Sequence, residues 1–208
     1  MVWSKFLAQQ VSHPSGLFGR LILPHLWNRR NSTLNEATLT HLALIPQDRV
    51  LEIGFGGGYL LQRMAQITTT GLVAGVDVSN TMVDVCRKKF RSLIDTNRLE
   101  LKTAIAETLP FPDRHFNKVC SVNSIFYWQN PAQAFAEIRR VLTGEGLLVL
   151  CFTCKSSMQD KGFAQENGVK LYEIDEIKKM MAAAGFADIT IQKATDKHRT
   201  FACILGNR

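Results

Sequence analysis

The sequence has no long apolar run. Across its 208 residues no stretch of about 18 apolar residues occurs, which argues against a membrane-spanning helix. The first twenty residues also lack the apolar core and the small-residue cleavage site of a secretory signal. We therefore expect a cytoplasmic protein. A chain of this length can bury a core of its own without disulfides or metals, which favours one globular domain.

Cysteine is scarce. The chain has five cysteines, and an odd number argues against a disulfide framework. Cys151 and Cys154 form a C-x-x-C pattern, which leaves two interpretations open: a metal or redox pair, or two thiols at the end of a strand. A structural metal site needs about two more ligands, and no second pair exists. We expect reduced, mostly buried thiols and no metal.

Acidic residues are outnumbered. The chain has 25 Lys and Arg against 18 Asp and Glu, a net charge of +7 and a pI of about 9.3, which permits polyanionic partners. The densest basic run is CRKKFR, residues 86–91. It lies on a predicted helix whose apolar residues occupy the other face. The run is either a solvated face or a patch for a polyanion.

Strand-like and helix-like segments alternate along the chain. The expected strands are 50–53, 72–76, 98–103, 118–123, 147–152, 187–194 and 200–206. The expected helices are 34–45, 59–67, 80–93, 131–142 and 174–184. This order implies right-handed crossovers. We predict a doubly wound, mostly parallel seven-stranded α/β sheet with helices on both faces and a C-terminal antiparallel hairpin. Residues 34–208 would form this domain, and residues 1–33 an apolar and basic helical segment ahead of it.

The stretch VLEIGFGGG, residues 50–58, places four glycines directly after the first expected strand. Glycine there indicates left-handed backbone or a close approach by a ligand. In this fold such a turn binds either a dinucleotide or S-adenosylmethionine. The dinucleotide fingerprint requires a small residue where this chain has Tyr59, which argues against a nicotinamide dehydrogenase.

Four motifs in this order resemble class I S-adenosylmethionine-dependent methyltransferases of the ubiquinone-biosynthesis-like branch, also called methyltransferase type 11. They are EIGFGGG, GVDVS, ETLPFPDRHFNKVCSVNSIFYW and FAEIRRVLTGEGLLVL, and the resemblance covers roughly residues 45–190. It implies S-adenosylmethionine as the cofactor. The implied cofactor-binding residues are Glu52, Gly54, Gly56, Gly58, Asp77, Val78, Met82, Ala106, Glu107 and Asn123.

Each of these residues has an expected role. The glycines would admit the methionine part of the cofactor at a helix N-terminus, and Glu52 would accept from its ammonium directly or through water. Asp77 would accept from the ribose hydroxyls, although an acid at a strand end can also cap a helix. Val78 and Met82 would pack on the adenine.

The chain departs from the family at two positions. Ile105 stands where the family usually has an acid that binds the adenine amino group, so adenine recognition would depend on packing and on backbone near Ala106. Glu107 would substitute in part or remain solvated. Asn117 replaces an aspartate and brings no charge.

The acceptor side is less defined. Phe126, Tyr127 and Trp128 would wall an acceptor pocket or simply pack below the sheet. The segment lacks the Pro-Pro-aromatic motif of enzymes that methylate exocyclic amines of nucleobases. We name no catalytic residue. His115 is expected to be structural, and the remaining histidines considered lie in the flanks: His13, His25 and His198.

Three interpretations of residues 1–33 stay open: a lid over the acceptor, a peripheral membrane contact, or core packing. The resemblance favours a methyltransferase acting on a small, apolar or amphiphilic molecule by in-line transfer at C, O or N. The alternatives are an RNA methyltransferase, motivated by the pI, and a cofactor-binding protein without catalysis. Nucleic acid is not the expected partner.

Overall fold

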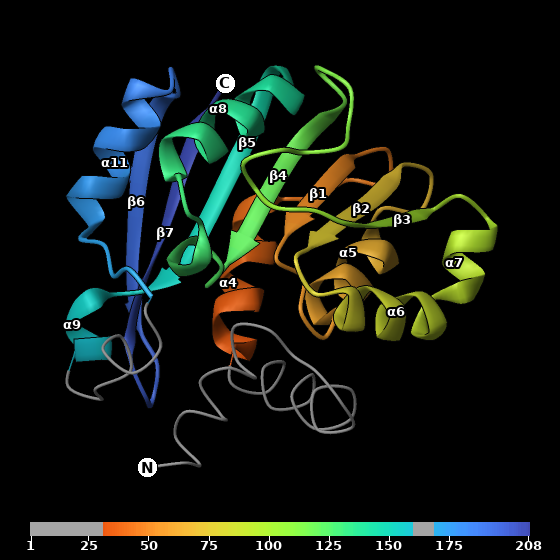
Figure 1. Ribbon diagram of the computed structural model, residues 1–208, viewed down its shortest axis with the longest axis horizontal. Helices are drawn as coiled ribbons and strands as arrows, with labels where there is room; N and C mark the ends of the chain where they lie inside the picture. Colours follow the sequence, from red (N-terminus) through yellow and green to blue (C-terminus); the bar gives the residue numbers. More distant parts are fainter. Residues whose placement is uncertain (1–30, 160–168) are drawn as a thin grey trace.

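The computed structural model describes residues 31–159 and 169–208 (Figure 1). The expectations for residues 1–30, including the lid, the membrane contact, His13 and His25, lie outside the described residues. The first described helix, α4 (Ser32–Leu42), ends where Ala43 adopts a left-handed conformation with φ 45°. It begins two residues before the predicted start at residue 34 and ends three residues before the predicted end at residue 45.

One seven-stranded sheet organises the chain, with the strand order β3-β2-β1-β4-β5-β7-β6. The pairs among β1 to β5 are parallel, while β7 is antiparallel to both β5 and β6. This confirms the predicted mostly parallel sheet with a C-terminal antiparallel hairpin. The strands are β1 (Arg49–Ile53), β2 (Leu72–Asp77), β3 (Leu99–Thr103), β4 (Phe116–Val122), β5 (Leu142–Thr153), β6 (Ala187–Thr195) and β7 (Thr200–Asn207).

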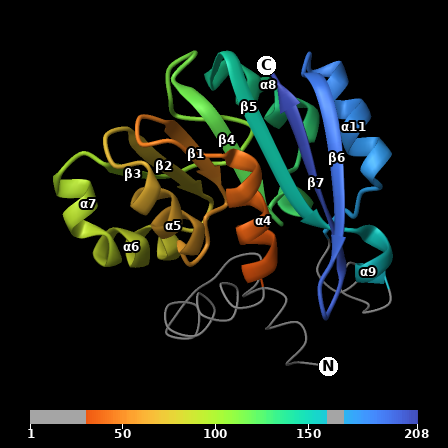
Figure 2. The same ribbon diagram turned by 180° about the vertical axis from the view of Figure 1, so that it is seen from behind.

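Helices cover both faces of this sheet. One face carries α8 (Pro131–Val141) and α11 (Ile174–Ala183), which lie in front of the strands in Figure 1. The opposite face, seen in Figure 2, carries α4, α5 (Tyr59–Ile67) and α6 (Asn80–Lys89). Each helix buries an apolar stripe against the alternating side chains of the strands, so two hydrophobic cores form.

The first strand shows how the alternation works. Leu51 and Ile53 point into the core beneath α8, whereas Val50 points into the core beneath α5. Successive residues of a strand face opposite sides of the sheet, so an apolar run without alternation is the signature of a strand covered on both faces. This accounts for the predicted strand and for its place near the centre of the sheet.

Four elements differ from the sequence prediction. The helix predicted over 80–93 is interrupted at Phe90 and continues as the short α7 (Arg91–Asp95). Strand β5 follows α8 directly from Leu142 and so begins five residues before the start of the predicted strand 147–152. Two short helices were not predicted, η1 (Ile125–Tyr127) and α9 (Lys155–Gln159).

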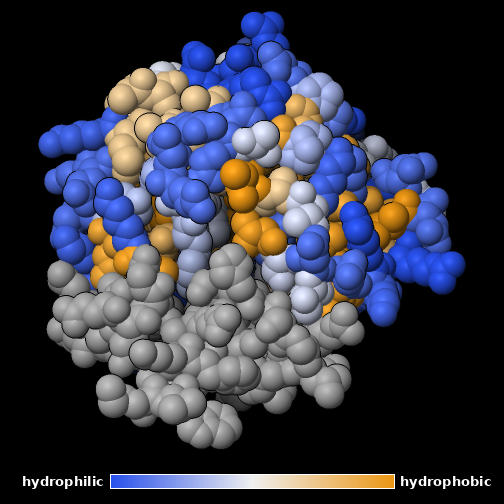
Figure 3. Space-filling view, in the orientation of Figure 1, coloured by the Kyte–Doolittle hydropathy of each residue, from blue (hydrophilic) through white to orange (hydrophobic). Residues whose placement is uncertain are grey.

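Helix caps were predictable. The Ser79 side chain accepts from the Met82 N–H at the start of α6, and Asn130 accepts from the Gln133 N–H ahead of Pro131 in α8. Within residues 31–159 and 169–208, no helix is both long enough and apolar enough to cross a bilayer. In the space-filling view, hydrophobic surface appears as small orange patches separated by hydrophilic blue (Figure 3).

Candidate active site

The glycine-rich turn leads from the carboxyl end of β1 into α5. Gly54, Gly56 and Gly58 all have left-handed backbone, with φ values of 79°, 49° and 69°. A Cβ on Gly54 would lie 2.6 Å from the Cβ of Ser124, and one on Gly58 would lie 2.8 Å from the Phe90 ring. Glycine is therefore required at 54 and 58 by backbone conformation and by contacts within the protein itself. Contact of these glycines with a cofactor stays a prediction.

Asp77 holds this turn from the neighbouring strand. Its carboxylate accepts from the Gly56 N–H at 2.8 Å and from the Ser79 N–H at 2.9 Å. Burial raises the pKa of the Asp77 carboxyl, and these two donors offset part of the rise. The side chain is therefore both a cap for the turn before α6 and a carboxylate at the tip of β2, next to the glycines.

Glu52 lies beneath the turn, on β1. Its side chain is buried, and its Oε2 has no hydrogen-bond partner among residues 31–159 and 169–208. Burial raises the pKa of this carboxyl to about 8, repulsion from Asp77 adds to the rise, and the Leu61 N–H in the first turn of α5 opposes it. Two buried carboxyl groups thus lie close together, and a cation placed near them would be stabilised.

The start of α5 is held from the side by α4. The Tyr59 hydroxyl donates to Glu36 Oε1 at 2.8 Å, and Arg63 forms an ion pair with the same carboxylate. Gly58 is the N-cap residue and has no side chain to cap the helix, while Glu52 accepts from the Leu61 N–H of the first turn. Exposed N–H groups at a helix start favour an anionic group, and a carboxylate fits there.

Two apolar side chains stand exposed beside the acids. Val78 follows β2 and is 46% exposed, while Ile105 follows the adjacent β3 and is 48% exposed. Met82, by contrast, is fully buried in the core under the turn. Two exposed apolar side chains therefore lie at the ends of adjacent strands, and the contact of Val78 and Met82 with adenine stays a prediction.

Ala106 and Glu107 are both buried. Glu107 Oε1 accepts from the Asn130 N–H at 2.9 Å, and its main-chain carbonyl accepts from the Gln133 side chain at 3.1 Å. The Glu107 carboxylate thus stabilises the start of α8, where helix N–H groups favour an anion. Its predicted role toward adenine stays a prediction.

Asn123 ends β4 in a left-handed conformation, with φ 55°, which asparagine tolerates better than most residues. Its Oδ1 accepts from the Thr153 N–H at 2.8 Å, and its Nδ2 donates to Asn31 at 3.0 Å. The side chain therefore joins the ends of β4 and β5 to the chain just ahead of α4. It borders the glycine turn through its neighbour Ser124.

The three aromatic side chains that follow β4 differ in their exposure to solvent. Phe126 and Trp128 are buried, and Trp128 packs edge-on against Phe135 with ring centroids 5.6 Å apart. Trp128 also donates from Nε1 to the Ser124 hydroxyl at 3.2 Å. Tyr127 is the exposed member, at 37%, and the predicted role of the three aromatics as walls of an acceptor pocket stays a prediction.

A serine pair supports this region and was not predicted. The hydroxyls of Ser121 and Ser124 are hydrogen-bonded to each other, and Ser121 donates to the Ile53 carbonyl at 3.0 Å. These contacts fix the end of β4 against the end of β1. The sequence offered one signal for this pair, which is the occurrence of two serines three residues apart at the end of a strand.

His115 lies at the amino ends of the strands, on the side of the sheet opposite the glycine turn. It precedes β4 and contacts the Arg49 guanidinium, with Nε2 and Nη2 2.6 Å apart. Partial burial and the Arg49 charge lower the pKa of His115. It sits far from the carboxyl ends of the strands, as a structural residue would. His198 is exposed in the turn between β6 and β7.

The C-x-x-C pattern does not act as a unit in the described fold. Cys151 lies in β5 opposite Cys203 of β7, and their sulfurs are 2.8 Å apart, while Cys154 follows the end of β5. All five cysteines are free thiols and buried. Among residues 31–159 and 169–208, no group of His, Cys, Asp or Glu side chains is placed to hold a metal ion.

Comparison with known proteins agrees with this geometry. A family described as "Methyltransferase domain" matches residues 51–150, from β1 to β5. The chain is 27% identical over 188 residues to an uncharacterized methyltransferase, YdaC, of Bacillus subtilis (strain 168), covering 90% of this chain and 98% of the relative. It is 35% identical over 107 residues to the ubiquinone/menaquinone biosynthesis C-methyltransferase UbiE of Psychromonas ingrahamii, covering 50% of this chain and only 43% of the relative.

A solved structure shares nearly the whole fold. Geranyl diphosphate methyltransferase, determined in complex with S-adenosylmethionine, matches with a TM-score of 0.74 at 17% identity, over 94% of this chain and 92% of that one. At this identity the likeness concerns the fold. The family match and the relatives, together with the glycine turn and the acid at the tip of β2, support a class I S-adenosylmethionine-dependent methyltransferase.

Proposed function

We propose that the protein methylates a small, apolar or amphiphilic molecule. Relatives support this substrate class, because UbiE is a C-methyltransferase of ubiquinone and menaquinone biosynthesis and the structural neighbour is a geranyl diphosphate methyltransferase. The observation that carries the proposal is the convergence, at one edge of the sheet, of the glycine turn, the Asp77 carboxylate and the exposed Tyr127.

The residues present fit S-adenosylmethionine. The cofactor has a cationic end, a carboxylate, a ribose and a flat adenine. One buried oxygen of Glu52 has no hydrogen-bond partner in the described part of the chain, and the start of α5, with glycine as its N-cap, follows the turn above it. Asp77 is the acceptor for ribose hydroxyls, and Val78 with Ile105 is the apolar surface for adenine.

When bound, the cofactor supplies an electrophilic methyl group on its sulfonium sulfur. The residues of the chain position the two reactants. The glycine turn and Asp77 hold the cofactor, and the segment from Ser124 to Trp128 holds the methyl acceptor. The edge-to-face packing of Trp128 on Phe135 keeps that segment rigid. An aromatic and apolar lining at Tyr127 would exclude water from the acceptor.

The test is an acceptor screen on the full chain. S-adenosylhomocysteine formation is followed with four acceptor classes: an isoprenoid quinol, a prenyl diphosphate, a fatty acid and an unmodified tRNA transcript. The proposal expects turnover with at least one of the three small molecules and none with tRNA. Turnover with tRNA alone would establish the RNA alternative, and cofactor binding without turnover on any acceptor would favour a protein without catalysis.

A further inference from the structure

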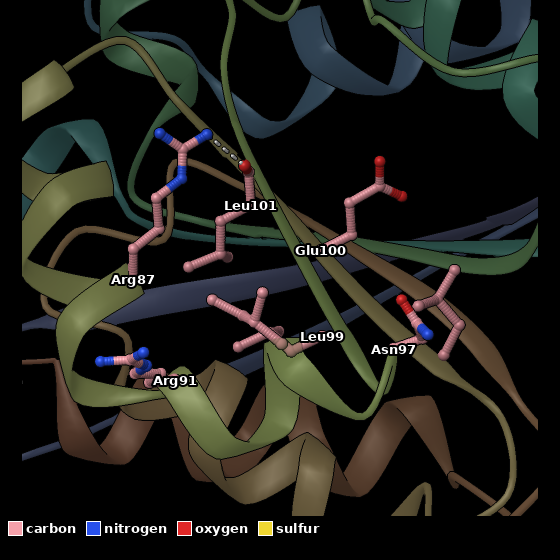
Figure 4. A pocket seen from close by; sticks show the side chains of 8 residues that line it. Arg87, Arg91, Asn97, Leu99, Glu100 and Leu101 are labelled. Carbon is pink, nitrogen blue, oxygen red and sulfur yellow. Dashed lines mark hydrogen bonds between the residues drawn. The ribbon is translucent and has the colours of Figure 1, made fainter.

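A second concave surface lies away from the active site, along the outer edge of the sheet. It is a cavity of about 620 Å³ between β3 and the helices α6 and α7. Its floor is apolar, with Leu72, Ile94, Leu99 and Leu101, and Arg87 and Arg91 stand on its helical side (Figure 4).

The backbone of β3 offers unpaired groups to this cavity. Strand β3 is the last in the sheet order, and it pairs only with β2 in the described part of the chain. The Val73 N–H donates to the Arg98 carbonyl, and the Ala104 N–H to the Asp77 carbonyl. The N–H and C=O groups of successive residues in a strand point to alternate neighbours. The two bonds above use the groups on the β2 side, so the N–H and C=O groups of Leu99, Leu101 and Thr103 point away from β2. An outward-facing row of this kind is a template for another strand.

One of these outward groups is occupied by a side chain. Arg87 Nη2 donates to the Leu101 carbonyl at 2.9 Å, as the dashed line in Figure 4 shows. This is the bond that the N–H of an added strand would make. The Arg87 side chain is 51% exposed and its Asp84 contact is at 4.0 Å, so little holds it in place.

We propose that this edge of β3 binds an extended, acidic segment of a partner protein by strand addition. The N–H groups of the added strand would replace Arg87 at the Leu101 carbonyl. The released guanidinium, together with Arg91 four residues further along, would then pair with carboxylates on alternate residues of the added strand. Between those carboxylates, apolar residues would cover Leu99 and Ile94.

Charge decides which partner fits. Two basic side chains, Arg87 and Arg91, line this cavity against one acidic side chain, Glu100, and the whole chain has a net charge of +7. A second copy of the chain would bring the same sign to the edge and be repelled. An acidic strand is attracted, which favours a different protein over self-association.

The experiment selects a displayed library of random short peptides on the full-length protein and measures the affinity of the enriched peptides by fluorescence anisotropy. We expect sequences in which Asp or Glu alternates with β-branched residues. The variant R87E/R91E should lower their affinity by about tenfold or more. The variant K178E/K179E, which alters exposed lysines on α11 to the same extent, should leave it unchanged.

N-methylation of the peptide separates strand addition from a purely ionic contact without altering the protein. Methyl groups on alternate residues should abolish binding in one register and spare it in the other. The proposal is overturned if no peptide is enriched, which would mean that Arg87 merely shields the edge. It is also overturned if enriched peptides bind R87E/R91E as tightly as the unmodified protein, if both N-methylated registers bind, or if only a labelled single-stranded RNA depends on the two arginines. None of these outcomes depends on the methyl acceptor.

Discussion

The carboxylate of Asp77 accepts a hydrogen bond from the backbone N–H of Gly56 at 2.8 Å. The acid at the end of β2 therefore shapes the glycine turn at the end of β1 before any ligand is present. The carboxylate that fixes the turn is also the one that we propose accepts from the ribose hydroxyls of the cofactor. Such pre-organisation reduces the free-energy cost of binding.

Replacing Asp77 tests this connection. We expect Asp77→Ala to weaken S-adenosylmethionine binding by about tenfold or more, a loss of roughly 1.5–3 kcal/mol, because hydrogen bonds to a charged group are lost. Calorimetric titration gives the affinity, and circular dichroism reports the fold. Asp175→Ala, an exposed aspartate in the first turn of α11, is the matched control. An unchanged affinity in a folded Asp77→Ala variant would remove the ribose assignment.

The turn glycines differ from surface glycines in their steric surroundings. Gly54→Ala introduces a Cβ 2.6 Å from that of Ser124 at a φ of 79°, so we expect a loss of about 1–3 kcal/mol in the free energy of unfolding. Gly144, where a Cβ meets nothing within 4 Å, is the control, and Gly144→Ala should change stability by less than about 0.5 kcal/mol. Urea unfolding measures both, and equal values would contradict the steric account.

The raised pKa of Glu52 predicts that the free energy of unfolding depends on pH. Its pKa of about 8 in the folded protein lies above the unfolded value of about 4.3. Between these two pKa values the folded state retains a proton that the unfolded state loses. The contribution of Glu52 to the free energy of unfolding therefore declines as the pH rises from about 4.3 toward 8. Asp77, Cys86 and Cys120 are the titratable groups that share this environment.

The variant Glu52→Gln removes this proton equilibrium. We expect it to be more stable than the unmodified protein at pH 8, by an amount of order 1 kcal/mol or more, with the difference shrinking toward pH 5. Urea unfolding at several pH values measures the difference. Glu145→Gln, on an exposed side chain of β5, should follow the unmodified protein. A difference that stays constant with pH would show that Glu52 is ionised throughout.

The apolar pair beside the acids gives a further test. We expect Val78→Ser with Ile105→Ser to weaken S-adenosylmethionine binding by about tenfold, since each loses apolar contact with the adenine. Ile45, which is 54% exposed before the start of β1, provides Ile45→Ser as a control that should leave affinity unchanged. Loss of affinity in the control alone, or in neither variant, would place the adenine elsewhere.

Local signals in the sequence were sufficient for much of the fold. The apolar strand followed by glycines and the terminal hairpin both depend on neighbouring residues, and each lies where it was predicted. The carboxyl ends of adjacent parallel strands meet at one edge, so the glycine turn and Asp77 could be placed together before the structure was known.

Side-chain partners were not predictable, because they are chosen across long sequence separations. Glu107 was considered for adenine, but its carboxylate accepts from Asn130, 23 residues away. The helix break at Phe90 has a similar origin, since that ring packs where a Cβ on Gly58 would be. Periodicity identified Phe90 as a core residue and could not show which turn of the chain it would meet.

Calorimetric titration of the full chain with S-adenosylmethionine, S-adenosylhomocysteine and NAD, side by side, tests the central claim most directly. The account predicts that the two sulfur compounds bind with micromolar affinity and that NAD gives no heat, because Tyr59 stands where the dinucleotide fingerprint requires a small residue. A folded protein that binds neither sulfur compound, or that binds NAD instead, would contradict it.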